Sequence, residues 1–270
     1  MLLRLRALLI DLSGTLHVGD LPTPNAAHAL DKLREAGIAL RFVSNTSKES
    51  RSSLLTKLRK MHLDVREEEL FTSLSAAAEV VRNRKLNPLY LLSPSAREDF
   101  PPASPSPDSV VIGLAPAAFE YKQLNQAFRL LAGEVGSGRK KGEVPLIVTH
   151  KARYFGDKDG KLSLGPGPFI SALEEAAGVK AEIVGKPEPA FFQLALDSLK
   201  ALSLSPPEIG MIGDDVHQDV GPAVAALGLR RYLVKSGKYR EGDEEKCEAG
   251  RPDWCGDDFA SAVESILQDA

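Results

Sequence analysis

The sequence predicts a doubly wound α/β fold, in which helices cover both faces of a parallel sheet and a second α/β domain is inserted into the chain. Apolar strand-like runs alternate with amphipathic helix-like runs along most of the 270 residues, which is the rhythm of a parallel sheet. The pattern changes after Arg84 and resumes near residue 180. We therefore expect 1–84 and 180–270 to form a Rossmann-like core and 85–179 an inserted α/β cap.

In the first part of the core, apolar runs predict strands at 6–11 and 38–45. Helices are expected where apolar residues recur at helical spacing, at 25–37, 48–61 and 70–84. Gly37 supplies the C-terminal stop of the first helix.

The insert has its own alternation of elements. Strands are predicted at 87–95, 109–116 and 145–150, and helices at 120–133 and 168–178. Pro- and Ser-rich sequence at 96–108 and polar, Gly- and Lys-rich sequence at 134–143 predict loops. The core then resumes with strands at 181–187, 209–215 and 230–237 and helices at 189–202, 220–228 and 258–268.

Composition limits the classes of function. Hydrophobic residues make up 43% and charged residues 26% of the chain, which is an ordinary globular balance. The net charge of −3 provides no basic surface for nucleic acid. No apolar run approaches the roughly 20 residues of a membrane helix. Cys247 and Cys255 match no metal or redox spacing, so we expect free thiols and a cytoplasmic location.

Residues that carry chemistry follow the predicted core strands. Ligands in open parallel sheets bind outside the carboxyl ends of the strands, so these residues are expected to share one site. They are Asp11, Ser13, Gly14, Thr15, Ser44, Asn45, Lys186, Asp214, Asp215 and Asp219.

This set of side chains suits a cation and a phosphate. Converging carboxylates repel one another unless a cation lies between them, and Mg²⁺ prefers a few carboxylates plus substrate oxygens and waters. A lysine and a hydroxyl beside the cation favour an anionic ligand with several oxygens. Gly14 permits close approach of the backbone, and the amides after Asp11 can donate to a phosphoryl oxygen.

Each motif also has an ordinary explanation. Residues 11–15 can form a turn with an Asx cap, and 44–50 can cap the following helix. Residues 185–189 can be a turn before a helix with proline in its first turn, and 213–219 a solvated acidic loop. Four such motifs in order, each after a predicted strand, favour the functional interpretation.

The four motifs read DLSGT, VSNTS, VGKPEP and GDDVHQD. In this order they resemble the haloacid dehalogenase (HAD) superfamily, whose motifs are DxDGT, a Ser or Thr, a Lys and GDxxxxD. The insert resembles the large α/β cap of the type-2 capped phosphatase branch, and the likeness spans nearly the whole chain. The resemblance implies a Mg²⁺-dependent phosphohydrolase that acts on a small phosphorylated substrate.

The resemblance also implies a set of metal ligands. Asp11, Asp214 and the backbone carbonyl of Ser13 would hold Mg²⁺. Asp219 would act indirectly, through bound water or by orienting the lysine, and Asp215 is an alternative for that role.

The same resemblance assigns the reacting groups. Asp11 would be the nucleophile that forms an aspartyl phosphate. Ser44, Lys186 and the loop at Gly14 would bind the phosphoryl oxygens and offset the charge that develops on them. Asn45 would support that binding loop.

Ser13 departs from the family pattern, because the second Asp of the motif is missing. That Asp normally protonates the leaving group, and a serine hydroxyl is too weak an acid or base to replace it. We therefore expect a preference for good leaving groups, and the resemblance points to pyrophosphate and to phosphoramidates such as phospholysine and phosphohistidine. The alternative is a weakened site that binds phosphate and Mg²⁺ and serves as a binding or regulatory module.

The cap offers candidates for substrate specificity. His150, Lys151, Arg153 and Tyr154 follow the strand predicted at 145–150, which we take as the last strand of the cap. They either contact an anionic or planar leaving group or are ordinary exposed residues. Homodimer formation through the cap is a further implication of the resemblance.

Overall fold

The computed structural model describes residues 4–135, 138, 140–156 and 161–268. The chain folds into two compact units. The core unit comprises Met1–Ser44, Leu55–Phe71 and Lys186–Ala270, and the second unit comprises Asn45–Leu54 and Thr72–Gly185.

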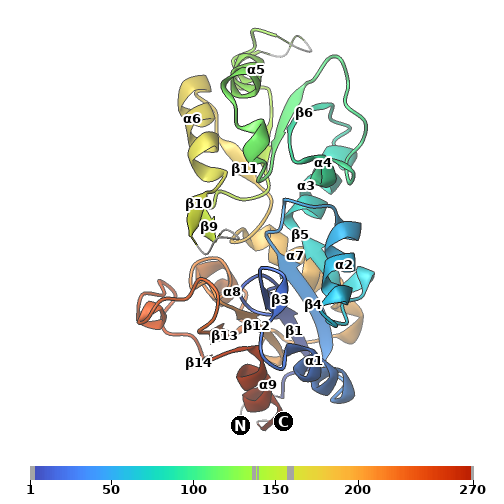
Figure 1. Ribbon diagram of the computed structural model, residues 1–270, viewed down its shortest axis with the longest axis vertical. Helices are drawn as coiled ribbons and strands as arrows, with labels where there is room; N and C mark the ends of the chain where they lie inside the picture. The colour runs from blue at the N-terminus through green and yellow to red at the C-terminus, as the bar shows by residue number, and fades with distance from the viewer. Residues whose placement is uncertain (1–3, 136–137, 139, 157–160, 269–270) are drawn as a thin grey trace. The chain divides into compact units, whose positions relative to one another are not determined.

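The core unit is built on a six-stranded sheet with the strand order β14-β13-β12-β1-β4-β5 (Figure 1). The strands are β1 (Ala7–Ile10), β4 (Ala39–Ser44), β5 (Leu70–Thr72), β12 (Ile209–Gly213), β13 (Arg230–Val234) and β14 (Trp254–Gly256). β1 pairs in parallel with both β4 and β12. All four residues of β1 are fully buried, as expected for a parallel strand covered on both faces.

The order in which successive strands are added to the sheet reverses between β1 and β12. From β1 the chain crosses through α1 (Ala26–Glu35) to β4 on one side, and from β12 through α8 (Pro222–Ala226) to β13 on the other. Because such crossovers are right-handed, α1 and α8 cover opposite faces of the sheet. The sheet therefore has a switch point at the carboxyl ends of β1 and β12, where ligands of such folds bind.

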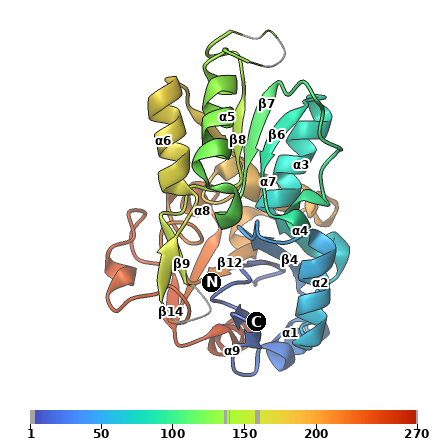
Figure 2. The same cartoon turned by 45° about the horizontal axis from the view of Figure 1, so that its top comes forward.

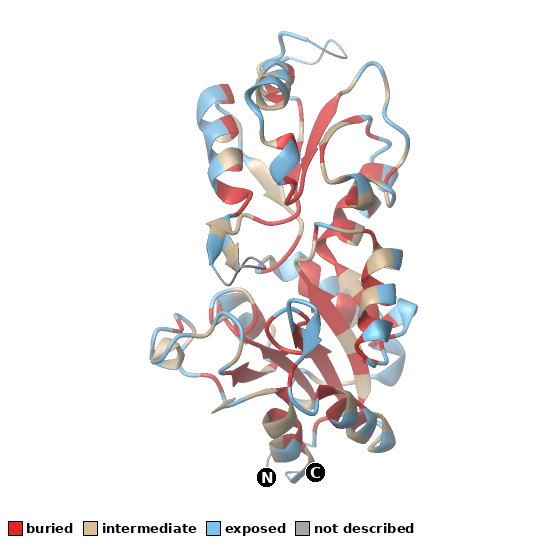
Figure 3. Ribbon diagram, viewed as in Figure 1, coloured by how far each residue is buried: buried red, intermediate tan, exposed pale blue. Residues whose placement is uncertain are grey.

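Further helices complete the layers. α9 (Phe259–Gln268) packs against α1, and α7 (Pro189–Asp197) packs against α8 and β4. α2 (Arg51–Lys60) follows β4 in the chain. The buried residues concentrate in the strands and on the inner faces of the helices (Figure 3).

The second unit contains a four-stranded parallel sheet in the order β11-β8-β7-β6. Its strands are β6 (Pro88–Leu91), β7 (Ser109–Ile112), β8 (Leu146–Val148) and β11 (Ala181–Ile183). Its helices include α3 (Ser73–Asn83), α4 (Pro94–Arg97), α5 (Tyr121–Leu131) and α6 (Gly167–Ala177) (Figure 2).

Side chains of β7 alternate between two apolar clusters. Val110 and Ile112 belong to the cluster formed with α5 and α6, whereas Val111 belongs to the one formed with α3. Successive residues of a strand point to opposite faces. The second sheet is therefore covered on both faces, like the core sheet.

Several short elements were not expected from the sequence. β2 (His17–Val18) pairs with β3 (Leu21–Pro22), and β9 (Tyr154–Gly156) pairs with β10 (Leu162–Leu164), both antiparallel. β14 is a further addition, in parallel with β13. Strands of two or three residues leave too short a pattern to be recognised by alternation.

The helix predicted at 70–84 is wrong in its first turn. Leu70–Thr72 forms β5, and the helix α3 begins only at Ser73. Thr72 is the N-cap residue: its side chain accepts a hydrogen bond from the N–H of Ser75, and its backbone is extended. An extended cap residue lets the chain pass directly from strand to helix.

The strand predicted at 181–187 was assigned to the resumed core, which the structure contradicts. β11 pairs with β8 in the second sheet. Both sheets have parallel strands of similar composition, so the run of apolar residues alone does not tell which sheet it joins. The domain boundaries 1–84, 85–179 and 180–270 remain a prediction.

None of the helices in the described part of the chain combines the length and apolar character that crossing a membrane requires. Cys247 and Cys255 are both free thiols, as expected.

A buried ion pair ties α1 to the turn before β5. The Arg34 guanidinium donates to both carboxylate oxygens of Glu69, at 2.9 and 2.7 Å, and Glu69 also accepts from the N–H of Arg66. Burial acts to raise the pKa of Glu69, but these hydrogen bonds and the Arg34 charge bring it below its ordinary value.

Glu69→Gln is expected to lower the free energy of unfolding by about 2 kcal/mol, because the amide faces Arg34 with one acceptor fewer. Since the folded pKa of Glu69 is depressed, this stabilisation is present at neutral pH and lost as the pH falls through the folded value. Urea unfolding at pH 7 and pH 3 measures both effects. Glu245→Gln, in an exposed pair with Arg251, is the control and should change stability by less than about 0.5 kcal/mol; equal effects of the two variants would contradict the prediction.

Candidate active site

Two neighbouring strands of the core sheet each deliver a carboxylate at the switch point. Asp11 follows β1 directly, and Asp214 follows β12 directly. The two strands are in register, with Ile10 opposite Ile212, and the N–H of Asp11 donates to the carbonyl of Ile212 at 2.9 Å. The parallel pairing of β1 and β12 therefore brings these two side chains together.

A buried lysine lies between two carboxylates. Lys186 Nζ donates to Asp11 Oδ1 at 2.5 Å and to Asp219 Oδ1 at 2.6 Å. All three side chains are at most 6% exposed. Burial opposes the charge of Lys186, but the two carboxylates outweigh it and raise the lysine pKa above its ordinary value.

Lys186 reaches this position from a segment that differs from the expected one. It follows β11, a strand of the second sheet, and precedes α7 rather than following a core strand. The lysine is nevertheless brought together with Asp11 and Asp219, as expected for a shared site.

The three carboxylates of Asp11, Asp214 and Asp219 each place an oxygen within 4.8 Å of the others. Burial and the charges of Asp11 and Asp219 raise the pKa of Asp214 well above its ordinary value. Burial, together with Asp11 and Asp215, raises the pKa of Asp219 to about 6, although Lys186 opposes this. Both shifts indicate an excess of negative charge away from water.

Asp214 has one oxygen that the described residues leave unpaired. Its Oδ2 accepts from the N–H of Lys238 at 2.6 Å, whereas its buried Oδ1 has no hydrogen-bond partner. A buried acceptor without a partner is costly. The carboxylates of Asp11, Asp214 and Asp219 offer only oxygen ligands, which Mg²⁺ prefers. The residues present therefore fit the cation that the resemblance implies.

Asp215 has a different role from its neighbours. Its Oδ1 accepts from the N–H groups of His217 and Gln218, at 2.9 and 3.0 Å, and its Oδ2 pairs with Lys238 Nζ at 3.3 Å. It does not belong to the carboxylate group found among the described residues. Asp215 thus shapes the loop that carries Asp219, whose N–H bonds to the carbonyl of Asp215.

The loop after Asp11 has one exposed and one crowded residue. The Ser13 side chain is exposed, while Gly14 is buried and has a φ of 103°. A Cβ at Gly14 would overlap the Asp214 carboxylate, so only glycine allows this loop to approach Asp214. Thr15 Oγ1 donates to Asp11 Oδ2 at 3.4 Å.

The second motif is divided between the two units. Ser44 is the last residue of β4, which pairs with β1, and it is buried. Asn45 belongs to the second unit, where its side-chain oxygen lies beside Gly185 and Ser73. The structure thus places Ser44 at the carboxyl end of the strand next to β1.

Comparisons with known proteins decide the family. Residues 8–100 match the family model described as haloacid dehalogenase-like hydrolase, and residues 183–262 match the one described as HAD-hydrolase-like. The chain is 48% identical over 265 residues to haloacid dehalogenase-like hydrolase domain-containing protein 2 from Bos taurus, covering 98% of this chain and 96% of that protein. The chain belongs to the haloacid dehalogenase-like hydrolase family.

A second relative of the HAD family is phospholysine phosphohistidine inorganic pyrophosphate phosphatase from Homo sapiens. It is 34% identical over 271 residues, covering 98% of this chain and 95% of that protein. The crystal structure of 4-nitrophenylphosphatase from Thermotoga maritima has the same fold, with a TM-score of 0.82, 24% identity and 97% coverage of both chains. The predicted fold class and enzyme class, a HAD-like phosphatase or hydrolase, are confirmed.

The four cap candidates of this HAD hydrolase differ in their surroundings. His150 is buried, and its Nε2 lies 3.2 Å from the Ser47 hydroxyl. Lys151 pairs with Glu174 at 2.6 Å, while Arg153 and Tyr154 are exposed. The strand before them, β8, is an inner strand of its sheet and not the last one, because β11 follows and pairs with it.

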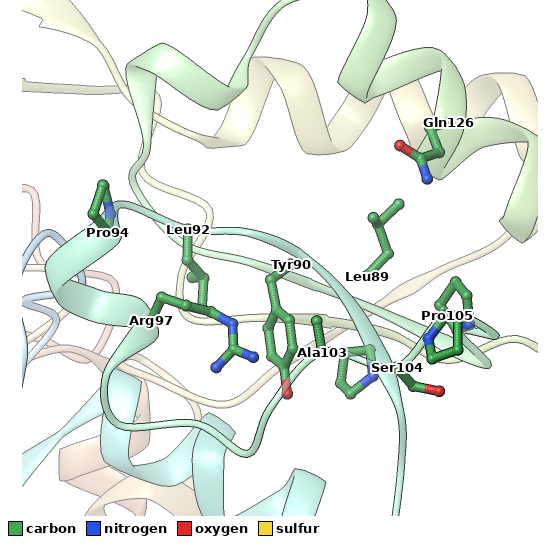
Figure 4. Close-up of a pocket in the computed structure, with 11 residues that line it drawn as sticks. Leu89, Tyr90, Leu92, Pro94, Arg97, Ala103, Ser104, Pro105 and Gln126 are labelled. Carbon is green, nitrogen blue, oxygen red and sulfur yellow. The ribbon is translucent and has the colours of Figure 1, made fainter.

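The second unit of this HAD hydrolase also contains a pocket of about 480 Å³ beside β6. Figure 4 shows its lining side chains, among them Leu89, Tyr90 and Pro105. Arg97 is the only charged residue among the described residues that line it, and its guanidinium stacks 3.9 Å from the centre of the Tyr90 ring. The pocket therefore lacks the converging carboxylates of the candidate site.

Sequence reasoning missed Ser236, Gly237 and Lys238, which follow β13 and contact Asp214 and the loop at Gly14. The strand predicted at 230–237 extends three residues beyond the observed end of β13 at Val234, so Ser236 and Gly237 were assigned to the strand and not to the loop after it.

Asp214→Asn is expected to stabilise the metal-free protein by about 1 kcal/mol, because it removes a buried charge that faces two others. Asp215→Asn is the control. It should destabilise by about 1 kcal/mol, since it removes the Oδ2 charge that pairs with Lys238 and weakens the two backbone hydrogen bonds to Oδ1. Thermal unfolding in EDTA measures both changes in stability. A destabilised Asp214→Asn variant would show that the charge of Asp214 does not destabilise the metal-free protein.

Proposed function

We propose that this chain is a Mg²⁺-dependent phosphohydrolase that works through an aspartyl phosphate on Asp11 and favours substrates with good leaving groups. The observation that carries the proposal is the group of three buried carboxylates beside a buried lysine. The substrate in this account is a small phosphorylated molecule.

In this proposal Asp11, Asp214 and the backbone carbonyl of Ser13 hold Mg²⁺. The unpaired Oδ1 of Asp214 is the oxygen available for it. When bound, the cation neutralises the surplus negative charge and draws electron density from the phosphoryl oxygens. Asp219 acts indirectly by holding Lys186, and Asp215 fixes the loop between them.

The first chemical step forms a bond between a carboxylate oxygen of Asp11 and phosphorus. The bond to the leaving atom breaks, and the leaving group takes the electron pair and gains a proton from water. In the second step water attacks the phosphorus and gives up a proton to the solvent, the Asp11 carboxylate leaves with the bonding pair, and inorganic phosphate is released. Both steps are balanced without an oxidant or reductant.

The remaining residues bind the phosphoryl group. Lys186 and the hydroxyl of Ser44 offset the charge on its oxygens, and the backbone of Gly14 leaves room for them. Asn45 supports the Ser44 loop. In the second unit, Arg153 and Tyr154 are the exposed candidates for contact with the leaving group, whereas His150 and Lys151 would first have to release their present partners.

Ser13 sets the substrate preference. A positioned acid or base contributes about 10²–10⁴-fold to the rate, which is about 3–5 kcal/mol of barrier. Without a positioned acid, the alkoxide of an alkyl phosphate leaves slowly. Pyrophosphate loses phosphate, and a phosphoramidate loses an amine whose nitrogen water can protonate, so both depend less on that acid. The 34% identical relative is named for pyrophosphate and for the phosphoramidates phospholysine and phosphohistidine, which supports the proposal.

The alternative is a HAD-like protein that binds Mg²⁺ and phosphate but turns over too slowly to act as an enzyme. The serine in place of the acid–base residue favours it. In that case the acidic group would still bind the cation, and phosphate would bind without being released from a substrate. Cytoplasmic location and homodimer formation also remain predictions.

Asp11→Asn should lower the rate of phosphate release from pyrophosphate in Mg²⁺ by at least about 10³-fold, because the amide is not a nucleophile. A colorimetric phosphate assay with and without EDTA measures this rate. Asp31→Asn, on the exposed side of α1, is the control and should retain full activity. If the parent protein releases no phosphate from pyrophosphate, the result contradicts the proposed activity and supports the alternative, a protein that only binds Mg²⁺ and phosphate.

Ser13→Asp should raise the rate on phenyl phosphate and on alkyl monoesters by about 10²-fold or more, since it restores the residue that protonates their poor leaving groups. Pyrophosphate should gain less, because its leaving group needs less help. Steady-state rates on the three substrates test this, with Ser13→Asn as the matched variant without an ionisable group. If Asp and Asn at this position give equal rates on the monoesters, Ser13 does not limit the substrate range.

A further inference from the structure

The segment Ser236, Gly237 and Lys238 lies at the carboxyl end of β13, the neighbour of β12 in the core sheet. None of its side chains is one of the three clustered carboxylates. It nevertheless contacts two parts of the candidate site, Asp214 and the loop at Gly14.

The first contact fixes one carboxylate oxygen. The N–H of Lys238 donates to Asp214 Oδ2 at 2.6 Å, which is the short distance typical of a charge-assisted hydrogen bond. The other oxygen, Oδ1, has no partner among the described residues. The backbone of Lys238 therefore determines which oxygen of Asp214 remains available.

The second contact is steric. Gly237 has a φ of 56°, and a Cβ there would overlap Asp214 Oδ2 and the Cα of Gly14. Glycine at this position lets the segment close onto both groups at once. A larger residue would push the Asp214 carboxylate away or move the segment out.

The third contact reaches the loop after Asp11. The Ser236 hydroxyl donates to the carbonyl of Gly14 at 2.5 Å. This carbonyl is adjacent in the chain to that of Ser13, which the proposed function assigns to the cation. One segment thus fixes both a side-chain ligand and the backbone next to a second ligand.

We propose that Ser236, Gly237 and Lys238 are positioning residues for the metal site: they orient the Asp214 carboxylate and the Ser13–Gly14 backbone toward a divalent cation. The inference rests on the proposed function for the identity of the cation. It concerns the affinity for the ion and not the chemistry at phosphorus. Hydrogen-bonded groups behind metal ligands typically contribute about 10–100-fold to metal affinity.

Gly237→Ala tests the steric contact, and the chain provides a matched control. Gly242 also has a positive φ, of 80°, but a Cβ there meets nothing within 4 Å. Gly242→Ala therefore introduces the same kind of backbone strain in the same region without touching Asp214. Ser236→Ala tests the hydrogen bond to Gly14 with a smaller change, in case Gly237→Ala folds poorly.

The experiment titrates Mg²⁺ into the full chain by calorimetry and follows thermal unfolding of the same samples in EDTA. We expect Gly237→Ala to weaken Mg²⁺ binding by at least about 10-fold relative to Gly242→Ala, measured at a temperature at which the unfolding curves in EDTA show both variants to be folded. Ser236→Ala should weaken binding by about 3-fold or more relative to the parent. These magnitudes follow from the usual effect of groups behind metal ligands.

The outcomes separate this inference from the proposed function. Mg²⁺ affinities of Gly237→Ala and Ser236→Ala within twofold of Gly242→Ala and the parent would overturn the inference, even if the parent hydrolyses pyrophosphate. Weakened binding in a chain that hydrolyses no phosphorylated substrate would support the inference and overturn the proposed function. A parent chain that binds no Mg²⁺ at millimolar concentration would overturn both.

Discussion

The site depends on the ammonium of Lys186, which lies buried between the carboxylates of Asp11 and Asp219. Charges this far from water are tolerated only when they are paired and hydrogen-bonded. One ammonium cannot neutralise three carboxylates, and Asp214 is left with an unpaired oxygen. This imbalance defines the site: the fold holds a surplus of negative charge in place, and a divalent cation is the ordinary way to neutralise it.

The rest of the core unit can be understood as the support of this charge arrangement. The parallel pairing of β1 with β12 sets Asp11 beside Asp214, and Gly14 and Gly237 are needed because their neighbours lie too close for a side chain. β1, which is followed directly by Asp11, is apolar and fully buried. Such an arrangement sacrifices stability for function, as sites with converging like charges generally do.

The sequence was sufficient to predict the α/β class of the core, because mostly apolar runs at 7–10, 39–44 and 209–213 each end at a polar motif. It did not predict the short strands β5 and β14. It also predicted that Asp11 and Asp214 lie together, since the carboxyl ends of parallel strands share one edge. Lys186 lies beside Asp11 as expected, but it follows β11 of the second sheet, so this reason does not account for it. The sequence did not predict that 181–183 joins the second sheet, because composition does not specify a strand's neighbour. The burial of His150 and the contacts of Ser236–Lys238 depend on tertiary packing, which no local pattern records.

The most direct test of the account is to identify the phosphorylated residue during turnover. The protein is mixed with pyrophosphate and Mg²⁺, quenched rapidly in acid and reduced with borohydride, which converts an aspartyl phosphate into homoserine. Peptide mass spectrometry then locates the modified residue. The account predicts homoserine at position 11 and nowhere else; phosphate release without modification of Asp11, or with phosphate on another residue, would contradict it.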